Sequence, residues 1–401
     1  METKLIKDNI AEAAEIIKSG GLVAVPTETV YGLAANGLDE RAVREVYEVK
    51  GRPAVKPLSL MVPDKSAMAD YCEAVPEAAE YLAERFWPGP LTIVLKAKPN
   101  VPAIVRAGGE TVGLRCPDHP LTLEALRLAK VPFAAPSANP SGSESPKNAT
   151  KVLEYFSGKI QAIIDGGSCG IGRESTLIDM SAEPYRILRE GALSEADVAD
   201  ALVDNMKIIG ITGGTGSGKT TALDVLRDFG ALVIDCDALY HELLEHSAEL
   251  VAEIDSEFPS AVVDGRVERK ALGEIVFADA DKLAKLNAIT HSAISREVQR
   301  RMRAWAMQGG TLAAVDAIEL ISSGLAARCC ATVGVVAERE VRLARIMARD
   351  GVSEAYAQKR INAQHPDEYF AEHCDYILHN NGTREEFSDC CLNLFLEVLK
   401  K

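Results

Sequence analysis

The chain has 401 residues and a formal net charge of −15 at pH 7, with 47% hydrophobic and 26% charged residues. That length is more than one hydrophobic core usually serves, so two domains of about 200 residues are expected. Residues 1–206 hold 22 Lys and Arg against 29 Asp and Glu, and residues 207–401 hold 22 against 30. Because both halves are acidic, we expect no extended electrostatic surface for nucleic acid.

The sequence also constrains the cellular setting. No apolar run reaches the length of a membrane span, and the first residues show no signal-peptide core, so we expect a cytoplasmic protein without membrane partners. Nine cysteines include no C-x-x-C pair, which excludes the usual spacing of a zinc site and argues against a disulfide framework.

The first half alternates predicted helices and strands. Apolar positions recur at helical spacing over residues 9–19, and glycines end this pattern before an apolar strand at 22–25. A second helix is expected at 40–49, and an acidic start at Ser194 predicts a connecting helix that ends near Asn205. This alternation predicts an α/β fold, with further short strands expected at 58–62, 91–95, 112–114 and 160–164.

Four clusters in the first half carry more hydroxyl, basic and glycine residues than packing alone would need. Hydroxyls at the end of a strand lie where open α/β sheets bind ligands, and basic residues stiffened by prolines suit phosphate or carboxylate. Ser137 and Asn139 would project on the same side of an extended segment. Taken singly, each cluster could be a solvated charge run or an ordinary turn; they lie at 26–33, 50–57, 131–142 and 165–191.

In this order the clusters resemble the YrdC-like threonylcarbamoyl-AMP synthase family. The resemblance runs from Gly20 to Gly191 and rests on PTETVYGL (26–33), KGRP-x-x-KPLS (50–59), WPGPLT (87–92), TVGLRCP (111–117), APSANPSG (135–142) and GRESTLID (172–179). It implies a twisted open α/β sheet and a reaction of L-threonine, bicarbonate and ATP that gives threonylcarbamoyl-AMP and pyrophosphate. The product serves threonylcarbamoyladenosine modification of tRNA, which implies a hand-off to the tRNA threonylcarbamoyl-transfer machinery.

The same resemblance assigns site residues by motif. Six of them would hold ATP: Lys50, Arg52, Lys56, Thr111, Asn139 and Arg189. Four would hold threonine: Thr29, Arg115, Ser137 and Ser175. An RNA-binding module is the alternative for this half, although its acidity and the lack of aromatic residues among basic ones weigh against it.

A P-loop pattern opens the second half. Residues 207–212 form an apolar run that leads into Gly213-x-x-x-x-Gly218-Lys219-Thr220, and a helical pattern follows at 222–229. The glycines let consecutive backbone N–H groups face an anion, the lysine supplies a charge to the outer phosphates, and the threonine hydroxyl can bind Mg²⁺. A chance glycine-rich turn is the alternative, but the strand and helix on either side favour a nucleotide site.

Carboxylates and arginines follow the P-loop at the positions that phosphoryl transfer needs. A strand at 231–234 leads into Asp235 and Asp237, of which one could accept a proton from a substrate hydroxyl, although an aspartate there could also be a helix cap. A strand at 311–315 ends in Asp316, which resembles a Walker B carboxylate. A helix at 338–350 places Arg342, Arg345 and Arg349 on one face, as in a lid over the phosphates or a solvated face.

These parts resemble dephospho-CoA kinase over residues 207 to about 398. The resemblance implies transfer of the ATP γ-phosphate to the ribose 3′-hydroxyl of dephospho-CoA, with Asp237 as the base, Lys219 and Arg349 on the phosphates and Thr220 on Mg²⁺. The further ATP contacts would be Gly213, Gly214, Gly216, Ser217, Gly218, Thr221 and Arg345.

The second half departs from that family on the acceptor side. Relatives usually carry Pro-Leu-Leu and a glutamate after the strand that ends here in Asp316, and a His-Pro pair where this chain has His291-Ser292. Another nucleoside-like or pantetheine-bearing acceptor is therefore the alternative substrate. A residue pattern N-K-x-D, typical of guanine recognition, is absent from this half of the sequence.

Together these observations predict a bifunctional enzyme. Residues 1–205 are expected to form the threonylcarbamoyl-AMP synthase domain, and residues 206–401 a P-loop kinase domain with a parallel sheet and a helical lid. ATP is a substrate of both halves and Mg²⁺ the expected cofactor. The opposing hypothesis is that only one half is active and the other serves as a scaffold or RNA-binding module.

Overall fold

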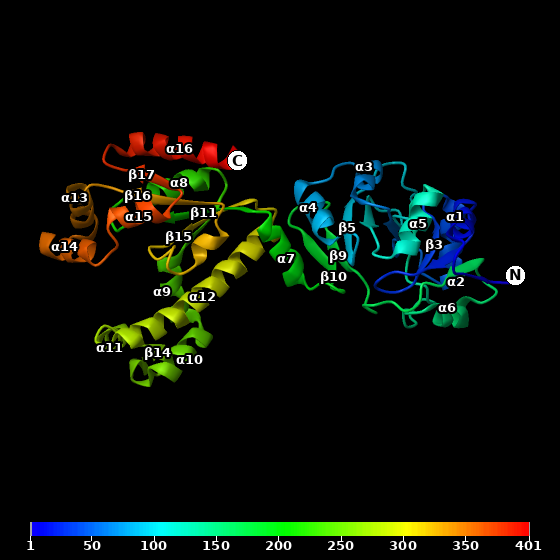
Figure 1. Cartoon of the computed structure of the whole chain (residues 1–401), viewed down its shortest axis with the longest axis horizontal. Helices are drawn as coiled ribbons and strands as arrows, with labels where there is room; N and C mark the ends of the chain where they lie inside the picture. The colour runs from blue at the N-terminus through cyan, green and yellow to red at the C-terminus, as the bar shows by residue number, and fades with distance from the viewer. Residues whose placement is uncertain (1, 401) are drawn as a thin grey trace. The chain divides into compact units, whose positions relative to one another are not determined.

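The computed structural model describes residues 2–400, and within them the chain forms two compact units (Figure 1). The N-terminal unit comprises Met1–Asn205 with Met307–Gly309, and the C-terminal unit comprises Met206–Ala306 with Gly310–Lys401. Each unit has its own sheet and its own buried core, which confirms the predicted α/β fold class. Among the helices of residues 2–400, none combines the length and apolar composition that crossing a membrane requires.

The N-terminal unit is built on a mixed sheet of ten strands in the order β1-β8-β2-β3-β7-β4-β6-β5-β9-β10. Parallel and antiparallel neighbours alternate irregularly, as in β2, which pairs parallel with β8 and antiparallel with β3. The strands are β1 (Lys4–Ile6), β2 (Val23–Val25), β3 (Gly32–Asn36), β4 (Ser59–Met61), β5 (Leu91–Lys96), β6 (Thr111–Arg115), β7 (Phe133–Ala134), β8 (Ala162–Ile164), β9 (Thr176–Asp179) and β10 (Arg186–Arg189).

The three helices predicted for this unit are present within about one residue of the expected bounds, as α1, α2 and α7. Helix α1 (Ile10–Lys18) starts at Asn9, whose side chain accepts a hydrogen bond from the Glu12 N–H, and its apolar face packs on α5 (Pro120–Ala129). Helix α7 (Glu195–Asp204) starts with a capping box made by Ser194 and Asp197. The others are α2 (Glu40–Lys50), η1 (Lys65–Ala67), α3 (Met68–Tyr71), α4 (Glu77–Phe86) and α6 (Ala149–Phe156).

The C-terminal unit has a sheet of five parallel strands in the order β12-β15-β11-β16-β17. Because the strands are parallel, the segments that follow them meet at one edge of the sheet, where ligands of open α/β folds bind. The strands are β11 (Lys207–Thr212), β12 (Leu232–Asp235), β15 (Leu312–Asp316), β16 (Ala331–Val336) and β17 (Tyr376–His379).

Helices of the C-terminal unit form two groups. One group packs on the sheet or follows its strands, and comprises α8 (Lys219–Asp228), η3 (Leu325–Arg328), α13 (Arg339–Asp350), α14 (Glu354–Asn362), α15 (Asp367–His373) and α16 (Arg384–Lys400). The second group surrounds a separate apolar cluster that includes Leu250, Ile254 and Phe258. It consists of α9 (Cys236–His246), α10 (Ala248–Glu257), η2 (Pro259–Ala261), the hairpin β13 (Val262–Val263) and β14 (Arg266–Val267), α11 (Arg269–Val276) and α12 (Ala280–Met307).

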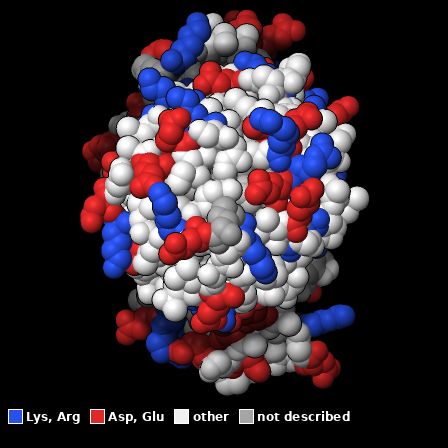
Figure 2. All heavy atoms as spheres, turned by 90° about the vertical axis from the view of Figure 1, so that its right-hand side faces the viewer, with Lys and Arg blue, Asp and Glu red and all other residues white. Residues whose placement is uncertain are grey.

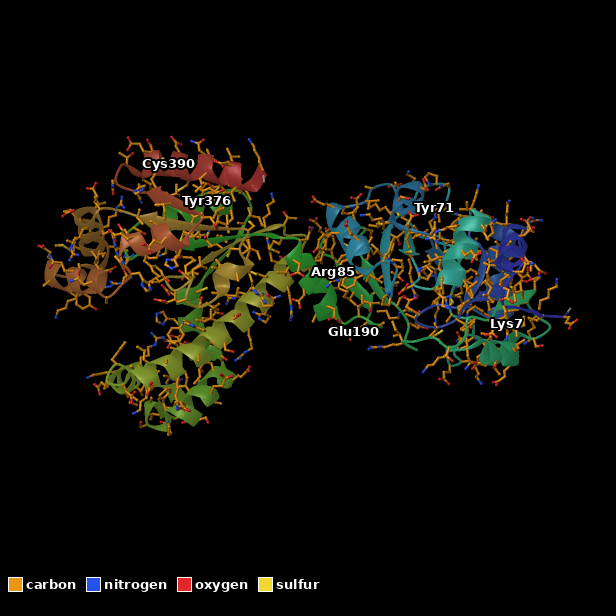
Figure 3. All side chains as sticks on the ribbon, in the orientation of Figure 1. Lys7, Tyr71, Arg85, Glu190, Tyr376 and Cys390 are labelled. Carbon is orange, nitrogen blue, oxygen red and sulfur yellow. The ribbon has the colours of Figure 1, made fainter. Side chains whose placement is uncertain are left out.

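The chain ends in a helix that the sequence analysis did not predict. Strand β17 is present, but α16 follows it and buries Phe387, Cys391, Phe395 and Val398 against the sheet core. Figure 3 shows Cys390, which is exposed, on this helix and Tyr376 on the neighbouring strand. The apolar spacing after residue 383 was the signal for this helix, because the buried residues recur every three or four positions.

Charged side chains of both signs are interspersed over the face of the molecule shown in Figure 2. No single-sign field dominates that face, in line with the acidic balance of both halves of the sequence. The positive potential that an anionic substrate needs must therefore come from local clusters.

Candidate active sites

An open cleft of about 810 Å³ in the N-terminal unit brings together segments far apart in the sequence. Five of the predicted site residues line it: Arg52, Arg115, Ser137, Ser175 and Arg189. They arrive from the segment after α2, the end of β6, the loop after β7, and the two antiparallel strands β9 and β10 with their flanks. Three guanidinium groups in one cleft make an anion-binding site of side-chain cations.

Arg115 lies at the bottom of this cleft and is held by three groups. Its Nη2 donates to Glu28 Oε1 at 2.6 Å and to Thr29 Oγ1 at 2.8 Å, and its Nε donates to the Gly89 carbonyl oxygen at 3.2 Å. The side chains of Arg115 and Glu28 are 8% and 13% exposed, so the ion pair is strongly desolvated. Thr29 is fully buried, so it acts on this site by orienting the arginine.

Arg189 is tied to the strand beside it and to a carboxylate. Its Nη1 contacts Glu174 Oε2 at 2.5 Å, and its Nε and Nη2 both donate to the Ser175 carbonyl oxygen. The Ser175 hydroxyl shares a hydrogen bond with Thr92 Oγ1 at 2.9 Å, and both residues line the cleft. Glu190, labelled in Figure 3, follows directly after β10.

Lys50 lies outside the lining of the cleft and braces one of its walls. The ammonium group is almost fully buried and donates to the carbonyl oxygens of Ser137 and Asn139. Its pKa is lowered to about 8, mainly by burial and also by the charge of Arg52, while Glu174 acts in the opposite direction.

The segment that contains Ser137 and Asn139 is not extended, in contrast to the expectation from the sequence. The segment is bent, with the Asn139 N–H donating to the Ser137 carbonyl oxygen at 3.0 Å, so the two side chains do not project alike from an extended strand. The Asn139 amide nitrogen donates to the carbonyl oxygens of Pro140 and Ser143. Its Oδ1 is buried and makes no hydrogen bond within residues 2–400.

The remaining predicted nucleotide residues of this half lie at the margin. Arg52 donates to the Lys56 and Pro57 carbonyl oxygens, and burial lowers its pKa, which indicates a cation that is poorly hydrated before any ligand arrives. The Lys56 side chain is exposed, and Thr111 begins β6 opposite Lys96 of β5. Neither Lys56 nor Thr111 lines the cleft.

The P-loop of the C-terminal unit joins β11 to α8 as the sequence predicts. Gly213, Gly216 and Gly218 have φ angles of 138°, 82° and 98°, a region that side chains rarely adopt. An added Cβ at Gly213 would lie 2.2 Å from the Val335 carbonyl oxygen, and one at Gly218 would lie 2.0 Å from Asn380 Nδ2. These positions therefore require glycine, because their φ angles are positive and the neighbouring atoms leave no space for a side chain.

Lys219 and Asp316 face each other at the end of neighbouring strands. The lysine Nζ lies 3.8 Å from Asp316 Oδ1 and donates to the Gly213 carbonyl oxygen at 3.0 Å. Burial raises the pKa of Asp316 to about 7, with Lys219 lowering it and Asp235 and Asp237 raising it. The buried Oδ1 makes no hydrogen bond within the described residues, so it retains an unused acceptor beside the P-loop.

The two aspartates after β12 have different tasks. Asp235 caps α9, because its Oδ1 accepts hydrogen bonds from the N–H groups of Asp237 and Ala238 at 2.9 Å each. Asp237 lies at the mouth of a second pocket. Surrounding protein atoms raise its pKa by limiting its hydration, while Lys219 acts in the opposite direction.

This second pocket, of about 690 Å³, combines apolar walls with polar groups. Its lining comes from α9, from the middle of α12 and from the segment after β15: Cys236, Asp237, Tyr240, Leu286, Asn287, Thr290, His291, Ile294, Ala317, Ile318, Glu319, Ser323 and Leu325. The segment that departs from the kinase family in sequence thus lies directly in this pocket, together with His291.

The arginines of α13 do not act alike. Arg345 donates to the carbonyl oxygen and side-chain oxygen of Asn380, each at 3.1 Å, and lies 3.4 Å from the Ser217 carbonyl oxygen. Arg342 is 5% exposed and contacts the P-loop residue Thr215. Arg349 pairs with Asp350 at 2.7 and 3.0 Å, one helical turn beyond Arg345.

Several residues that hold these sites were not singled out from the sequence. Glu28 and Glu174 are the carboxylates that pair with the arginines of the cleft, and both belong to the quoted motifs PTETVYGL and GRESTLID. Asn380 bonds to the Ser217 carbonyl oxygen at 2.8 Å, and Gln364 bonds to Thr215. A carboxylate or amide embedded in a motif was the only signal, and it does not reveal which partner it meets.

Comparisons with known proteins match a different family to each half of the chain. The Sua5/YciO/YrdC family model, described as telomere recombination, matches residues 15–191, and the dephospho-CoA kinase family model matches residues 207–386.

Similar curated proteins exist for each half. A threonylcarbamoyl-AMP synthase of Pyrococcus abyssi is 50% identical over 181 residues, which are 45% of this chain and 53% of that protein. The chain therefore spans about half the length of this relative. A protein of Methanocaldococcus jannaschii is 40% identical over 177 residues, 44% of this chain and 83% of its own length.

For the second half, a dephospho-CoA kinase of Geobacter sulfurreducens is 39% identical over 183 residues, 45% of this chain and 93% of its own length. Each match is confined to one half of the chain, as are the family models. The chain thus belongs to two families, the Sua5/YciO/YrdC family through residues 15–191 and the dephospho-CoA kinase family through residues 207–386.

Proposed function

We propose that the chain is a bifunctional enzyme. Residues 1–205 would convert L-threonine, bicarbonate and ATP into threonylcarbamoyl-AMP and pyrophosphate, and residues 206–401 would phosphorylate the 3′-hydroxyl of dephospho-CoA with ATP. The observation that carries the proposal is the presence of two candidate anion sites, one in each unit, each within the segment that a different enzyme family model matches.

In the first reaction, the threonine amino group would attack the bicarbonate carbon, a C–O bond breaks and water leaves, which gives a carbamate. A carbamate oxygen then attacks the α-phosphorus of ATP as pyrophosphate leaves. No protein nucleophile is needed, so the site works by positioning anions and stabilising charge. Arg52 and Arg189, which line the cleft, would neutralise the triphosphate, and Arg115, which bonds to Glu28 and Thr29, would pair with the threonine carboxylate.

In the second reaction, the P-loop and Lys219 hold the donor phosphates. Asp237 lines the second pocket and interacts electrostatically with Lys219, and there it would accept the proton of an acceptor hydroxyl as the γ-phosphate is transferred. Its raised pKa favours this role, because a base is more effective when its pKa is nearer to the working pH.

Residues beside the P-loop fit a Mg²⁺ ion. Magnesium prefers oxygen ligands, and both the Thr220 hydroxyl at the start of α8 and the unbonded Asp316 Oδ1 could supply them. A bound Mg²⁺ would offset the negative charge of the donor phosphates. Asp316 in its ionised form also attracts Lys219 and so helps to aim that ammonium group.

A different acceptor for the kinase is the second candidate function. The residues from Ala317 to Leu325 line the acceptor pocket, and this segment lacks the Pro-Leu-Leu run of the family. Another nucleoside-like or pantetheine-bearing alcohol would therefore be the acceptor if dephospho-CoA is not accepted.

One experiment tests both halves. The purified chain is incubated with ATP and Mg²⁺, with either dephospho-CoA or threonine plus bicarbonate, and ADP and pyrophosphate are followed separately. We expect ADP only with dephospho-CoA and pyrophosphate only with threonine and bicarbonate. Absence of either product would remove the corresponding activity, and ADP formation with another alcohol would identify the second candidate.

A further inference from the structure

The tip of the P-loop is tied to the helical segment that follows α13. All three polar groups of Thr215 are bonded: its N–H donates to Gln364 Oε1 at 2.8 Å, its Oγ1 accepts from Gln364 Nε2 at 2.8 Å, and its carbonyl oxygen accepts from Arg342 Nε at 3.1 Å. Gln364 Oε1 also accepts from Arg342 Nη2 at 3.0 Å. Gln364 follows α14 and lies 149 residues further along the chain than Thr215.

The surrounding packing leaves little freedom to this contact. Arg342 is 5% exposed, and its Nη2 lies 2.1 Å from where a Cβ at Gly214 would be placed. At Gly216 an added Cβ would lie 2.9 Å from the Arg342 carbonyl oxygen. Glycines on both sides of Thr215 therefore allow α13 to approach the loop backbone closely.

The hydrogen bonds also divide the backbone groups of the loop between two roles, because some anchor the loop and others stay free to bind phosphate. The Thr215 N–H is used by Gln364, so the amides left to face a phosphate begin at Gly216. On the other side of the loop, the Ser217 carbonyl oxygen is held by Asn380 Nδ2 at 2.8 Å. The Ser217 N–H is itself used by the Gly214 carbonyl oxygen at 3.2 Å. The two side-chain ties thus hold the loop on either side of the Gly216 amide, and each tie comes from outside the loop.

We propose that Gln364 is a positioning residue for the kinase reaction, which holds Thr215 and thereby fixes the phosphate-binding amides of the P-loop relative to α13. A glutamine suits this task because its carboxamide accepts and donates at once, matching both the N–H and the hydroxyl of Thr215. The inference rests on the proposed kinase activity and assigns Gln364 and Arg342 to the P-loop side of the site, away from the phosphates themselves.

The test compares Gln364→Leu with Gln358→Leu in the full chain. Gln358 is the matched control, because it lies on α14 and the one hydrogen bond of its side chain within residues 2–400 goes to Glu354, one turn away. Losing the two bonds to Thr215 should raise KM for ATP about 10- to 30-fold. KM for dephospho-CoA and threonine-dependent pyrophosphate release should stay unchanged, and the control should match the parent chain.

A double substitution separates positioning from a general structural effect. Thr215→Val alone removes one of the bonds and should raise KM for ATP about threefold. Added to Gln364→Leu, it should change KM for ATP less than twofold, because its partner is already gone. Additive effects of the two changes, or equal effects of Gln364→Leu and the control, would overturn the proposal.

A binding titration tests the role of Gln364 in ATP binding without any phosphate acceptor. A fluorescent ATP analogue is titrated into the full chain, and the signal of a Lys219→Ala chain is subtracted to isolate the P-loop site. Gln364→Leu should weaken the remaining binding about as much as it raises KM, and unchanged binding would overturn the proposal. If the parent chain binds the analogue but forms no ADP with dephospho-CoA, the acceptor assignment fails while the role of Gln364 is still decided.

Discussion

The P-loop of the C-terminal unit and the cleft of the N-terminal unit both attract anions, but with different parts of the chain. The P-loop presents backbone N–H groups of consecutive residues and one lysine. The cleft presents guanidinium groups from separate segments, each held by a carboxylate or a carbonyl oxygen. Main-chain recognition depends on loop shape, whereas side-chain recognition depends on several independent residues and their counter-ions.

The largest expected effect separates the two sites completely. Lys219→Ala removes the only lysine of the P-loop motif, so dephospho-CoA-dependent ADP release should fall below about a thousandth of its original rate. Threonine-dependent pyrophosphate release should be unaffected, because that site lies in the other unit. Product-resolved assays measure both rates, and a parallel loss of pyrophosphate release would show that the sites are not independent.

The corresponding substitution in the N-terminal cleft should have a smaller effect, because several cationic groups contribute to anion binding there. Arg52→Ala leaves Arg189 and Arg115 in place, so pyrophosphate release should fall about 100-fold with ADP release retained. Arg41→Ala is the matched control, since this arginine of α2 is 92% exposed and pairs only with Asp39. A loss below fivefold for Arg52→Ala would place the triphosphate elsewhere.

Asp316 offers a test through pH. Its pKa is raised to about 7 in the folded chain, so the ionised carboxylate costs folding free energy once the pH exceeds the ordinary value for aspartate. In metal-free buffer, Asp316→Asn should therefore raise the free energy of unfolding at pH 8 by on the order of 1 kcal/mol, and this gain should shrink as the pH falls from 7 towards 4.

The same substitution should lower kinase activity about 10-fold or more, because Lys219 loses its anionic partner. In the parent chain, kcat should fall as the pH is lowered, because protonation of Asp316 removes the same anionic partner. Denaturant unfolding and pH–rate profiles measure the two effects. A less stable Asp316→Asn chain at pH 8 would contradict the electrostatic account of this aspartate.

The smallest expected effect concerns a counter-ion of the cleft. Glu174 pairs with Arg189 where we place the triphosphate, so an incoming phosphate competes with this carboxylate. Glu174→Gln should lower KM for ATP in the synthase reaction about two- to fourfold at low ionic strength, with a smaller change at high salt. A raised KM for ATP would show instead that Glu174 favours nucleotide binding, for instance by interacting with the cation that accompanies ATP.

The contrast between main-chain and side-chain recognition also explains how well the sequence predicted each site. The P-loop was predictable because its glycines and Lys219 lie within eight consecutive residues, and a strand and a helix flank them. In the cleft, motif resemblance pointed to the residues, but not to their arrangement. Lys50 braces a wall of the cleft, and Asn139 turns its amide into its own loop.

Side-chain partners were beyond reach of the sequence. Gln364 meets Thr215 across 149 positions, and Glu28 meets Arg115 across 87. Arg349 pairs with its chain neighbour Asp350, whereas Arg345 meets Asn380, and the role of Arg349 on the phosphates stays a prediction. Residue spacing predicts which positions share a helix face, but the neighbouring elements decide what that face meets.

The most direct test of the two-site account is a titration of the full chain with a nonhydrolysable ATP analogue in the presence of Mg²⁺. We predict two binding equivalents per chain, with one lost in Lys219→Ala and the other lost in Arg52→Ala. A single equivalent in the parent chain, abolished by either substitution, would contradict the account.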